Sequence, residues 1–352
     1  MRADLFSAIN KVGVSLCRGS RTAHIWTVVA MRPKILSDLK VMRSKDVSQW
    51  YGEVMGAWGS LNHSTSEFSP MLWRNLGYWR DHSETLDQAA TNMATKLADA
   101  SGVRPGCDVL DVGCGLGEST FLLRERLDSG ADLPGGRLAG LDITAQHIAV
   151  AAARRTGDRP EFIVGSATEL PFSDESFDRI LALECAFHFP DRRKFFAEAL
   201  RVLRPGGVLG MADVVVARRP AQVRQWLNTV VPGWARIRID RLGFMILKTP
   251  SENLVTLPEY LDQLYVAGLV MPSSEDISDR VFPYFREHWR TSNNRAAQER
   301  ALRSGGLDAA QAHAHASAWR RQMRIFMLSW PISEYVIVTA RKPGGGSVQV
   351  DG

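Results

Sequence analysis

The sequence lacks the features of a membrane protein or of a disulfide-stabilised secreted protein. No run of eighteen apolar residues occurs in its 352 residues, so no segment is long enough to cross a bilayer as a helix. Its four cysteines form no Cys-x-x-Cys pair, and no Cys/His cluster has the spacing of a zinc site. The longest apolar stretch near the N-terminus, 25–31, is too short for a secretory signal and has no convincing cleavage site behind it. These absences predict a reduced, cytoplasmic protein that holds no metal.

An excess of charge of one sign is also lacking outside the N-terminus. The formal net charge is +5, but residues 1–45 hold nine Lys or Arg and only two Asp, so the rest of the chain is close to neutral. A near-neutral body predicts no groove for nucleic acid. Three interpretations of residues 1–45 stay open: a disordered basic tail, a tether to a membrane surface, or an extension ahead of a later start at Met31 or Met42.

Strands and helices alternate regularly in the middle of the chain. Apolar segments bounded by glycine or proline predict strands at 108–112, 137–143, 161–164, 177–184 and 208–216. Apolar residues at helical spacing predict helices at 117–127, 146–155 and 192–203. Such alternation predicts parallel βαβ units with right-handed crossovers, and a sheet covered by helices on both faces.

The flanking segments do not show this alternation of strands and helices. An aromatic, glycine-rich segment, 47–79, precedes a helix that Ser83 and Glu84 are predicted to open. After Pro220 the chain is largely helical, with predicted strands at 269–273 and 334–340. We therefore expect a basic tail (1–45), an N-terminal helical lid (46–100), a core (101–216), a helical cap and substrate region (217–331), a last core strand (332–343) and a flexible tail (344–352). A cap over the carboxyl edge of a parallel sheet usually shapes a ligand pocket.

The most informative segment, Asp111-Val-Gly-Cys-Gly-Leu-Gly117, carries three alternating glycines between a predicted strand and a predicted helix. Glycine lets the backbone turn with positive φ and lets a ligand approach the main chain, and a helix N-terminus offers free N–H groups. The nicotinamide-binding fingerprint Gly-x-Gly-x-x-Gly does not match, because the third glycine comes one residue early and Glu118 stands in its place. The acids Asp111 and Glu118 disfavour an anionic pyrophosphate and suit a cationic ligand.

A further acid, Asp142, ends the next predicted strand, where a carboxylate can accept both hydroxyls of a ribose. A Leu-Arg-Pro-Gly-Gly turn at 203–207 then precedes the fifth strand. In this order, the loop, the acid and the turn resemble the class I S-adenosylmethionine-dependent methyltransferases, specifically the small-molecule group that methylates antibiotics, sugars and lipids. The resemblance covers residues 75–216. It implies S-adenosyl-L-methionine as cofactor and an α/β, Rossmann-like fold, with a seven-stranded, mostly parallel sheet whose last strand is antiparallel.

The resemblance implies eight cofactor-binding residues: Asp111, Gly113, Gly115, Gly117, Asp142, Ile143, Ser166 and Ala167. The glycines wrap the methionine part of the cofactor, the first Asp holds the loop from below, and the second takes the ribose hydroxyls. The isoleucine packs on the adenine, and the last two residues edge it. This chain departs from the family at Ser166, where many relatives have Asp, and at His147, where they often have Gln.

Methyl transfer from a sulfonium is an in-line displacement, so the enzyme must align the nucleophile, the methyl group and the sulfur. A base is needed only when the nucleophile carries a proton that must leave. The resemblance implies that the end of the fourth strand, 184–188, points at the methyl group of the cofactor. Glu184 or His188 is then the candidate for removing a proton, with Asp213 orienting it. Each of the three also has a structural interpretation, as a cap or as a satisfied buried polar residue.

An apolar substrate pocket is the alternative at the same place. Phe187 stands where similar sugar O-methyltransferases have the histidine usually assigned as base, and it could line such a pocket together with Tyr78 and Trp79. An aromatic ring face also favours a nearby sulfonium or carbocation. The aromatic residues at 50–79 are equally explained as the core of the lid.

We expect an enzyme that methylates oxygen or carbon of a small, largely apolar metabolite, such as a secondary metabolite or a lipid. Two alternatives use the same fold: a C-methyltransferase of a prenyl diphosphate, whose phosphates Arg236, Arg238 and Arg241 could bind, and a cyclase or isomerase that keeps the cofactor. A methyltransferase of macromolecules and a non-catalytic binding protein are further alternatives. A homodimer is left open, since relatives frequently dimerise.

Overall fold

The computed structural model describes residues 75–130, 136–217, 249–291, 308–314 and 333–344, with residues 299, 303, 316 and 317. The expected basic tail, most of the expected cap and the three arginines Arg236, Arg238 and Arg241 lie outside these residues. Among the residues described, no helix has both the length and the apolar character needed to cross a membrane.

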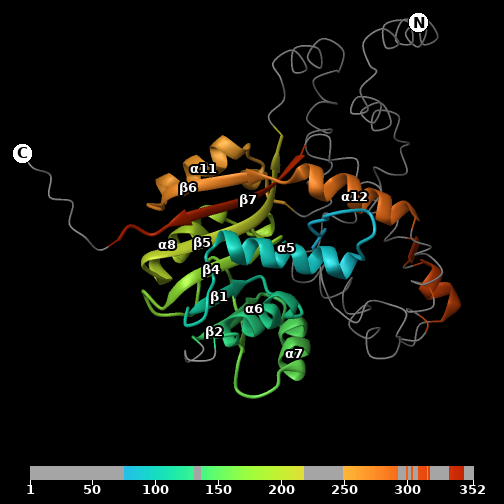
Figure 1. The fold of residues 1–352 in the computed structure, drawn as a ribbon, viewed down its shortest axis with the longest axis horizontal. Coiled ribbons are helices and arrows are strands. Elements are labelled where there is room, and N and C mark those ends of the chain that lie inside the picture. Colours follow the sequence, from blue (N-terminus) through green and yellow to red (C-terminus); the bar gives the residue numbers. More distant parts are fainter. Residues whose placement is uncertain are drawn as a thin grey trace, which may run out of the picture.

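The described residues form a seven-stranded sheet in the order β3-β2-β1-β4-β5-β7-β6 (Figure 1). The strands are β1 (Val109–Val112), β2 (Leu138–Asp142), β3 (Glu161–Val164), β4 (Phe177–Leu183), β5 (Leu203–Val216), β6 (Val270–Asp276) and β7 (Ser333–Arg341). Pairing is parallel from β3 to β5, and β7 runs antiparallel to both of its neighbours. The predicted fold class, a mostly parallel seven-stranded sheet with an antiparallel last strand, is thereby confirmed.

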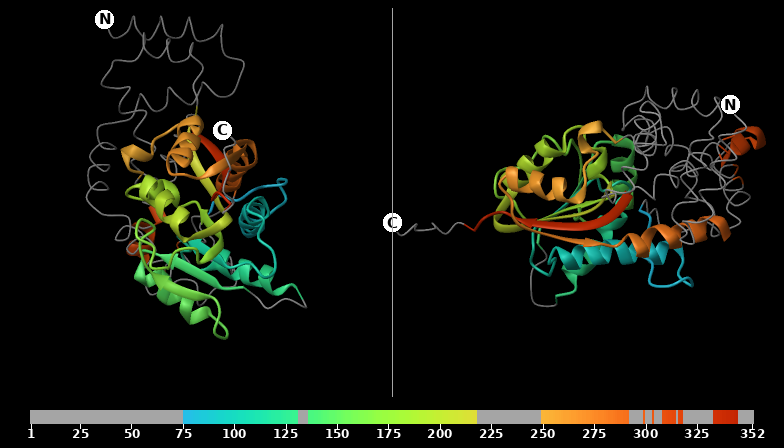
Figure 2. Two further views of the ribbon diagram at one scale, coloured as in Figure 1. Left: turned by 90° about the vertical axis from the view of Figure 1, so that its left-hand side faces the viewer. Right: turned by 90° about the horizontal axis from the view of Figure 1, so that it is seen from above.

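Helices cover both faces of the sheet. The side chains of α5 (Leu86–Ala100), α6 (Glu118–Asp128) and α12 (Ser278–Thr291) share one apolar cluster with the sheet. Those of α8 (Arg192–Val202) and α11 (Leu257–Val266) share a second cluster on the other face. Figure 2 shows α5 and α8 on opposite sides of the strands, and α7 (Ala145–Arg154) packs beside β2 and β3.

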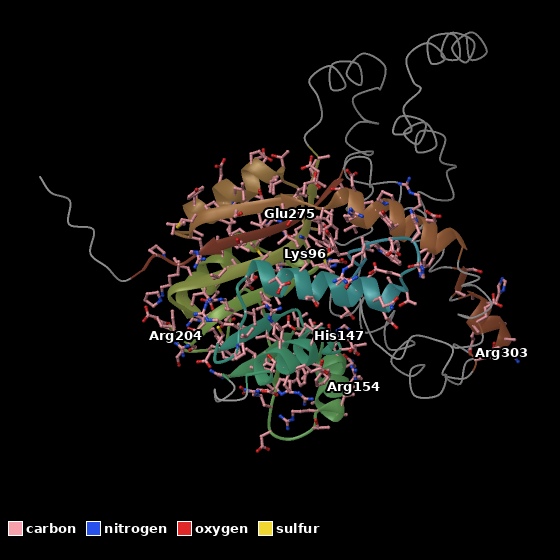
Figure 3. The ribbon with its side chains drawn as sticks, viewed as in Figure 1. Lys96, His147, Arg154, Arg204, Glu275 and Arg303 are labelled. Atoms are coloured by element: carbon pink, nitrogen blue, oxygen red, sulfur yellow. The ribbon has the colours of Figure 1, made fainter. Side chains whose placement is uncertain are left out.

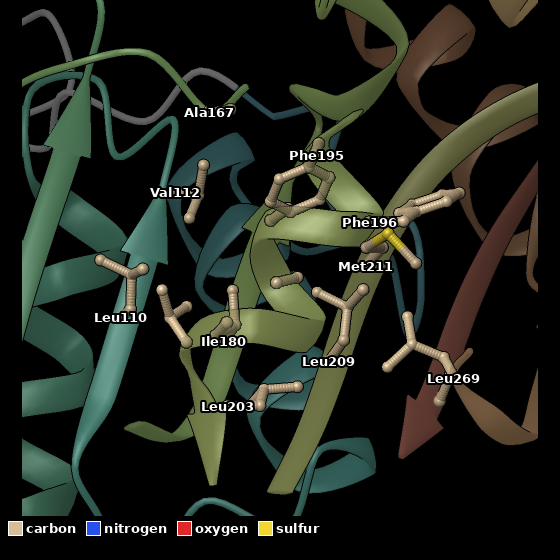
Figure 4. Packing of buried hydrophobic residues seen from close by; sticks show 14 of the residues in the cluster. Leu110, Val112, Ala167, Ile180, Phe195, Phe196, Leu203, Leu209, Met211 and Leu269 are labelled. Atoms are coloured by element: carbon tan, nitrogen blue, oxygen red, sulfur yellow. The ribbon is translucent and has the colours of Figure 1, made fainter. Parts of the chain in front are cut away.

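The alternation of side chains along β1 explains why this strand lies at the centre. Leu110 and Val112 point into the α8 layer, where Phe195 and Phe196 pack against the sheet (Figure 4). Val109 points to the other face, into the α5 layer. All four residues of β1 are buried, as expected for a short apolar strand covered on both sides. The carboxyl ends of β1, β2 and β4 therefore meet at one edge of a rigid platform.

The starts of two elements, α5 and β5, differ most from the sequence-based expectation. Helix α5 begins at Leu86 rather than at 83, because Thr85 forms a capping box with Gln88. Strand β5 begins at Leu203 rather than at 208. Leu203 pairs with Phe177, and pairing resumes at Val208, so the Arg-Pro-Gly-Gly turn is a bulge within the strand.

The expected lid over 46–100 contains, in its described part, a helix that covers a sheet face. Helix α5 packs on β4, β5 and β7, and only the segment before it approaches the carboxyl edge, where the Leu76 N–H contacts Glu184. The rest of this segment, 46–74, lies outside the described residues. The division of the chain into lid, core and cap stays a prediction there.

Candidate active site

The glycine loop after β1 is shaped by three different requirements. Gly113 (φ +71°) lies against the end of β4, and a Cβ there would come within 2.6 Å of the Cys185 Cβ. Gly117 (φ +91°) packs tightly on α7 and β3, where a Cβ would lie 3.1 Å from the Ala151 Cβ. Gly115 (φ +55°) differs, because no described atom lies within 4 Å of its Cβ position. The first and third glycines close the loop, and the middle one faces open space that a ligand can occupy.

Asp111 anchors this loop from beneath. Its Oδ2 accepts hydrogen bonds from the hydroxyls of Ser119 and Thr120, both at 2.6 Å, so β1 is tied to the first turn of α6. Burial raises the pKa of Asp111 to about 6, although the two hydroxyls lower it. The side chain is 1 % exposed and holds the loop without touching the open space above Gly115.

Asp142 ends β2 directly beside the glycine loop. Its Oδ2 accepts from the Gly115 N–H (3.0 Å) and its Oδ1 from the Thr144 N–H (2.8 Å), with Nδ1 of His147 at 3.3 Å. Burial disfavours the charged form, but these partners outweigh burial and lower the pKa of Asp142. His147, which stands where relatives often have Gln, therefore supports the carboxylate directly.

The two segments next to Asp142 complete this side of the site. Ile143 exposes 48 % of its surface although it is a large apolar residue at the end of a buried strand. Ser166 turns its hydroxyl inward, 3.2 Å from the Thr168 N–H, and closes a local turn, while Ala167 is buried. The Gly165 N–H donates to the Asp142 carbonyl, which keeps the Ser166 turn adjacent to the carboxylate.

Glu184 follows β4 and is held in a strained backbone conformation. Its φ of +52° is rare for a residue with a side chain. Its Oε1 accepts from the Leu76 N–H (2.7 Å) and from the hydroxyl of Tyr335 on β7. Burial raises the pKa of Glu184 to about 7, although both hydrogen bonds lower it; the nearby Asp213 charge raises it further. A carboxyl group with this pKa can take up a proton near neutral pH.

Phe187 and His188 lie on a short 3-10 turn, Ala186–His188, just after Glu184. Both side chains are buried, and their ring centroids are 4.2 Å apart. Phe187 packs into the apolar cluster of the α5 layer. The structure thus brings these two predicted residues together with Glu184 at the carboxyl end of β4.

Asp213 lies on β5 and accepts a hydrogen bond from the Phe187 N–H of this turn. Its side chain is fully buried among α8 and α11, where Oδ2 accepts from the Tyr260 hydroxyl (2.9 Å) and lies 3.5 Å from Nη1 of Arg192. Burial raises the pKa of Asp213, and Arg192 and Tyr260 lower it. The part of Asp213 in orienting a base stays a prediction.

Tyr78 and Trp79 lie in the seam between α5 and α12, where their N–H groups donate to the carbonyls of Ala89 and Arg280. Trp79 is 2 % exposed, its Nε1–H donates to the Leu76 carbonyl (2.9 Å), and its ring packs on His288. The Tyr78 ring lies 5.0 Å from Nζ of Lys96, whose ammonium pairs with Glu275 (Figure 3). Both rings pack against other residues of the protein, and their part in binding a substrate stays a prediction.

Sequence reasoning missed two supporting residues of the site. Tyr335 donates to Glu184 from the strand predicted at 334–340, and nothing in the sequence indicates this contact. Arg154 of α7 pairs with the buried Glu118 and donates to the Leu116 carbonyl (2.8 Å), which clamps the glycine loop. A buried acid in the first turn of a helix was the signal for Arg154, since a buried carboxylate needs a cationic partner. The described residues contain no group of three metal-ligating side chains.

Comparison with known proteins gives the same answer as this geometry. Residues 110–211 match the family model described as a methyltransferase domain. The chain is 32 % identical over 275 residues to the erythromycin 3''-O-methyltransferase of Saccharopolyspora erythraea, a match that covers 77 % of this chain and 83 % of that one. The chain belongs to the S-adenosylmethionine-dependent methyltransferases.

Two other proteins resemble this methyltransferase along most of its length. The 27-O-demethylrifamycin SV methyltransferase of Amycolatopsis mediterranei is 33 % identical over 281 residues, which covers 77 % of this chain and 92 % of that one. The crystal structure of the [4+2]-cyclase SpnF superposes with a TM-score of 0.59 at 24 % identity, over 85 % of this chain and 96 % of that one. At this identity the second match shows the fold alone.

Three features of the site are compatible with S-adenosylmethionine. Open space lies above Gly115, the Asp142 carboxylate is stabilised in its charged form, and the apolar Ile143 is exposed beside it. Open space suits the methionine chain of the cofactor, a carboxylate suits the ribose hydroxyls, and an exposed apolar side chain suits the adenine ring. When bound, the cofactor supplies a methyl group activated as a sulfonium substituent.

Proposed function

We propose that this methyltransferase acts on a hydroxyl group of a small, largely apolar metabolite, and that Glu184 takes the proton that the hydroxyl loses. Two relatives that match most of the chain are named for O-methylation of erythromycin and for methylation of 27-O-demethylrifamycin SV. A hydroxyl is a weak nucleophile, so a positioned base promotes its attack.

The geometry around Glu184 carries this proposal. Cys185, the next residue, touches Gly113 of the loop, so the carboxyl group lies where the fourth strand meets the cofactor side of the site. Its Oε1 is fixed by Leu76 and Tyr335, and its pKa of about 7 lets it exchange a proton under ordinary conditions. Buried His188 on the adjoining turn remains the second candidate for this role.

For the cofactor, we propose that Asp142 accepts the ribose hydroxyls and that Ile143 packs on the adenine, with Ser166 and Ala167 at its edge. Gly113, Gly115 and Gly117 then wrap the methionine part, and Asp111 holds them from below. Calorimetric titration with S-adenosylhomocysteine tests this assignment. Asp142→Ala is expected to weaken binding by about tenfold or more, since hydrogen bonds to a charged group contribute about 1.5–3 kcal/mol. Unchanged affinity would remove Asp142 from the cofactor site.

One alternative has a specific observation in its favour. The structural likeness to a [4+2]-cyclase shows that this fold is found in an enzyme named for a ring-forming reaction. A cyclase forms product without releasing S-adenosylhomocysteine, and a C-methyltransferase forms a product in which the methyl carbon is bound to carbon. A cytoplasmic location and a homodimer stay predictions.

The deciding experiment offers methyl-labelled S-adenosylmethionine and a panel of hydroxylated macrocycles and glycosides, including 27-O-demethylrifamycin SV. Release of S-adenosylhomocysteine with a labelled methyl ether, identified by nuclear magnetic resonance, is the expected result. Glu184→Gln is expected to lower turnover by about 10²-fold or more while it keeps S-adenosylhomocysteine affinity. Product with the label on carbon, or product without label, would replace this proposal with one of the two alternatives.

A further inference from the structure

The turn Ala186–His188 is held by side chains from two other parts of the chain. Nδ2 of Asn253 donates to the carbonyl oxygens of Phe187 (3.2 Å) and Phe189 (2.7 Å), and Asp213 accepts from the Phe187 N–H. Asn253 is 3 % exposed and Asp213 is fully buried. Two buried side chains from distant parts of the chain therefore bind three backbone groups of one short turn.

Arg192 connects these two residues through the Asp213 carboxylate and the main-chain carbonyl of Asn253. Its Nη1 lies 3.5 Å from Oδ2 of Asp213, and its Nη2 donates to the Asn253 carbonyl at 3.4 Å. Arg192 is the first residue of α8, where a cation opposes the helix dipole, and its side chain is 1 % exposed. A buried cation at a helix N-terminus is destabilising, and the contacts with the Asp213 carboxylate and the Asn253 carbonyl offset this cost. We call Arg192, Asp213 and Asn253 the turn clamp.

Asn253 also marks the point where the chain returns to the sheet after the insertion that follows β5. The Val216 N–H at the end of β5 donates to the Val255 carbonyl (2.9 Å), and Val216 pairs with Thr256. Both ends of the insertion therefore meet beside the turn. The insertion is the region that the sequence assigns to substrate binding, so Asn253 connects that region with the turn that bears Phe187 and His188.

We propose that Asn253 is a positioning residue for the methyl acceptor, which acts by fixing the turn Ala186–His188 against the carboxyl end of β5. This inference rests on the proposed function, which assigns the turn to the acceptor side of the site. An amide suits the task because it donates two hydrogen bonds in fixed directions to two carbonyl oxygens. A carboxylate of the same shape has no hydrogen to donate.

Hydrogen exchange of the protein without ligand tests the clamp itself. The amides of Phe187, His188 and Phe189 are each hydrogen-bonded within or to the turn, and their exchange reports its opening. Asn253→Asp and Asn253→Ala are expected to speed this exchange about thirtyfold, since each removes two hydrogen bonds that together contribute about 2 kcal/mol. Gln263→Leu is the matched control, because Gln263 contacts Arg192 but no atom of the turn. Exchange at the wild-type rate in both Asn253 variants would overturn the proposal.

The kinetic arm separates positioning from general support of the fold. With the acceptor that the panel identifies, Asn253→Asp is expected to lower kcat/KM for the acceptor about tenfold, while the Kd for S-adenosylhomocysteine changes less than twofold. Equal losses in both quantities would assign Asn253 a merely structural role and overturn the inference. If the wild-type protein turns over no hydroxylated acceptor, the proposed function fails, and the exchange experiment still decides whether the clamp exists.

Discussion

The Tyr335 hydroxyl on β7 donates a hydrogen bond to Oε1 of Glu184 after β4, although 151 positions separate the two residues in the sequence. Tyr335 is completely buried, and its ring packs against Phe282 of α12. The antiparallel strand added at the edge of the parallel strands thus delivers a proton donor to the candidate base.

The first prediction concerns the pH dependence of turnover in Tyr335→Phe. The Tyr335 hydrogen bond stabilises the charged form of Glu184 and lowers its pKa, so its removal raises that pKa above about 7. A general base works in its deprotonated form, and turnover is lost as pH falls through its pKa. The acid limb of the kcat profile is therefore expected to move upward by about one pH unit, which corresponds to about 1.4 kcal/mol. Tyr284→Phe, which removes a hydroxyl from α12, is the control and is expected to leave the limb in place.

The second prediction compares two glycines of the same loop. Gly113→Ala is expected to destabilise the fold by about 2 kcal/mol or more, because its Cβ would collide with Cys185 and its backbone is left-handed. Gly115→Ala meets no described atom and is expected to cost about 1 kcal/mol for its positive φ alone. Yet it places a methyl group in the space assigned to the cofactor, so S-adenosylhomocysteine is expected to bind at least tenfold more weakly. Urea unfolding and calorimetry measure the two effects; equal stability losses would show that the open space is not there.

The third prediction concerns stability against pH. Asp111 has a pKa of about 6 in the folded protein, raised from 3.8, so the folded state holds its proton more tightly than the unfolded state. The stability that this provides is fully present below about pH 4 and is lost as pH rises through about 6, a change of about 3 kcal/mol. Asp111→Asn removes the titration while its amide oxygen can still accept from Ser119 and Thr120. The difference in unfolding free energy between variant and wild type is expected to shift in favour of the variant between pH 4 and pH 6. A difference that stays constant across this range would contradict the assignment.

The fourth prediction concerns the buried pair Arg192 and Asp213. Either single substitution, Arg192→Met or Asp213→Leu, leaves an uncompensated charge in the core and is expected to cost about 3–5 kcal/mol. The double variant removes both charges and is expected to cost less than either single change, because no buried charge remains. Urea unfolding of the four proteins gives the coupling energy. Additive losses would mean that the two side chains do not interact.

Local patterns in the sequence predicted much of the fold. The short, mostly apolar strands, the glycine loop and the acid at Asp142 predicted the order of the elements, because a buried strand and a left-handed turn each require particular residue types. The start of α5 was missed by three positions, since Ser83, Glu84 and Thr85 can all precede a helix and only Thr85 forms the reciprocal bonds with Gln88. The start of β5 was missed because Pro205 and the two glycines after it usually end a strand, and here they form a bulge.

The features of the site that could not be predicted from the sequence depend on contacts between residues far apart in the chain. Glu184 was named, but nothing near it in the sequence indicates that Leu76 and Tyr335 hold its carboxyl group. Asp213 was named from the resemblance, but nothing near it in the sequence indicates that Arg192 and Tyr260 contact its carboxylate. These partners come from α8 and α11, and the sequence around Asp213 does not show which helices pack on its strand.

The bridge between Val216 and Val255 has a consequence for how such an enzyme can diversify. A segment that leaves and rejoins the sheet at one point is closed by the same two residues whatever its length, and closing a longer loop costs only slightly more free energy. The sheet and the glycine loop are therefore insulated from insertions, deletions and exchanges in this segment. Evolution, or an engineer grafting a segment from a relative, can exchange this segment, which the sequence predicts to bind the substrate, while the sheet and the glycine loop stay intact.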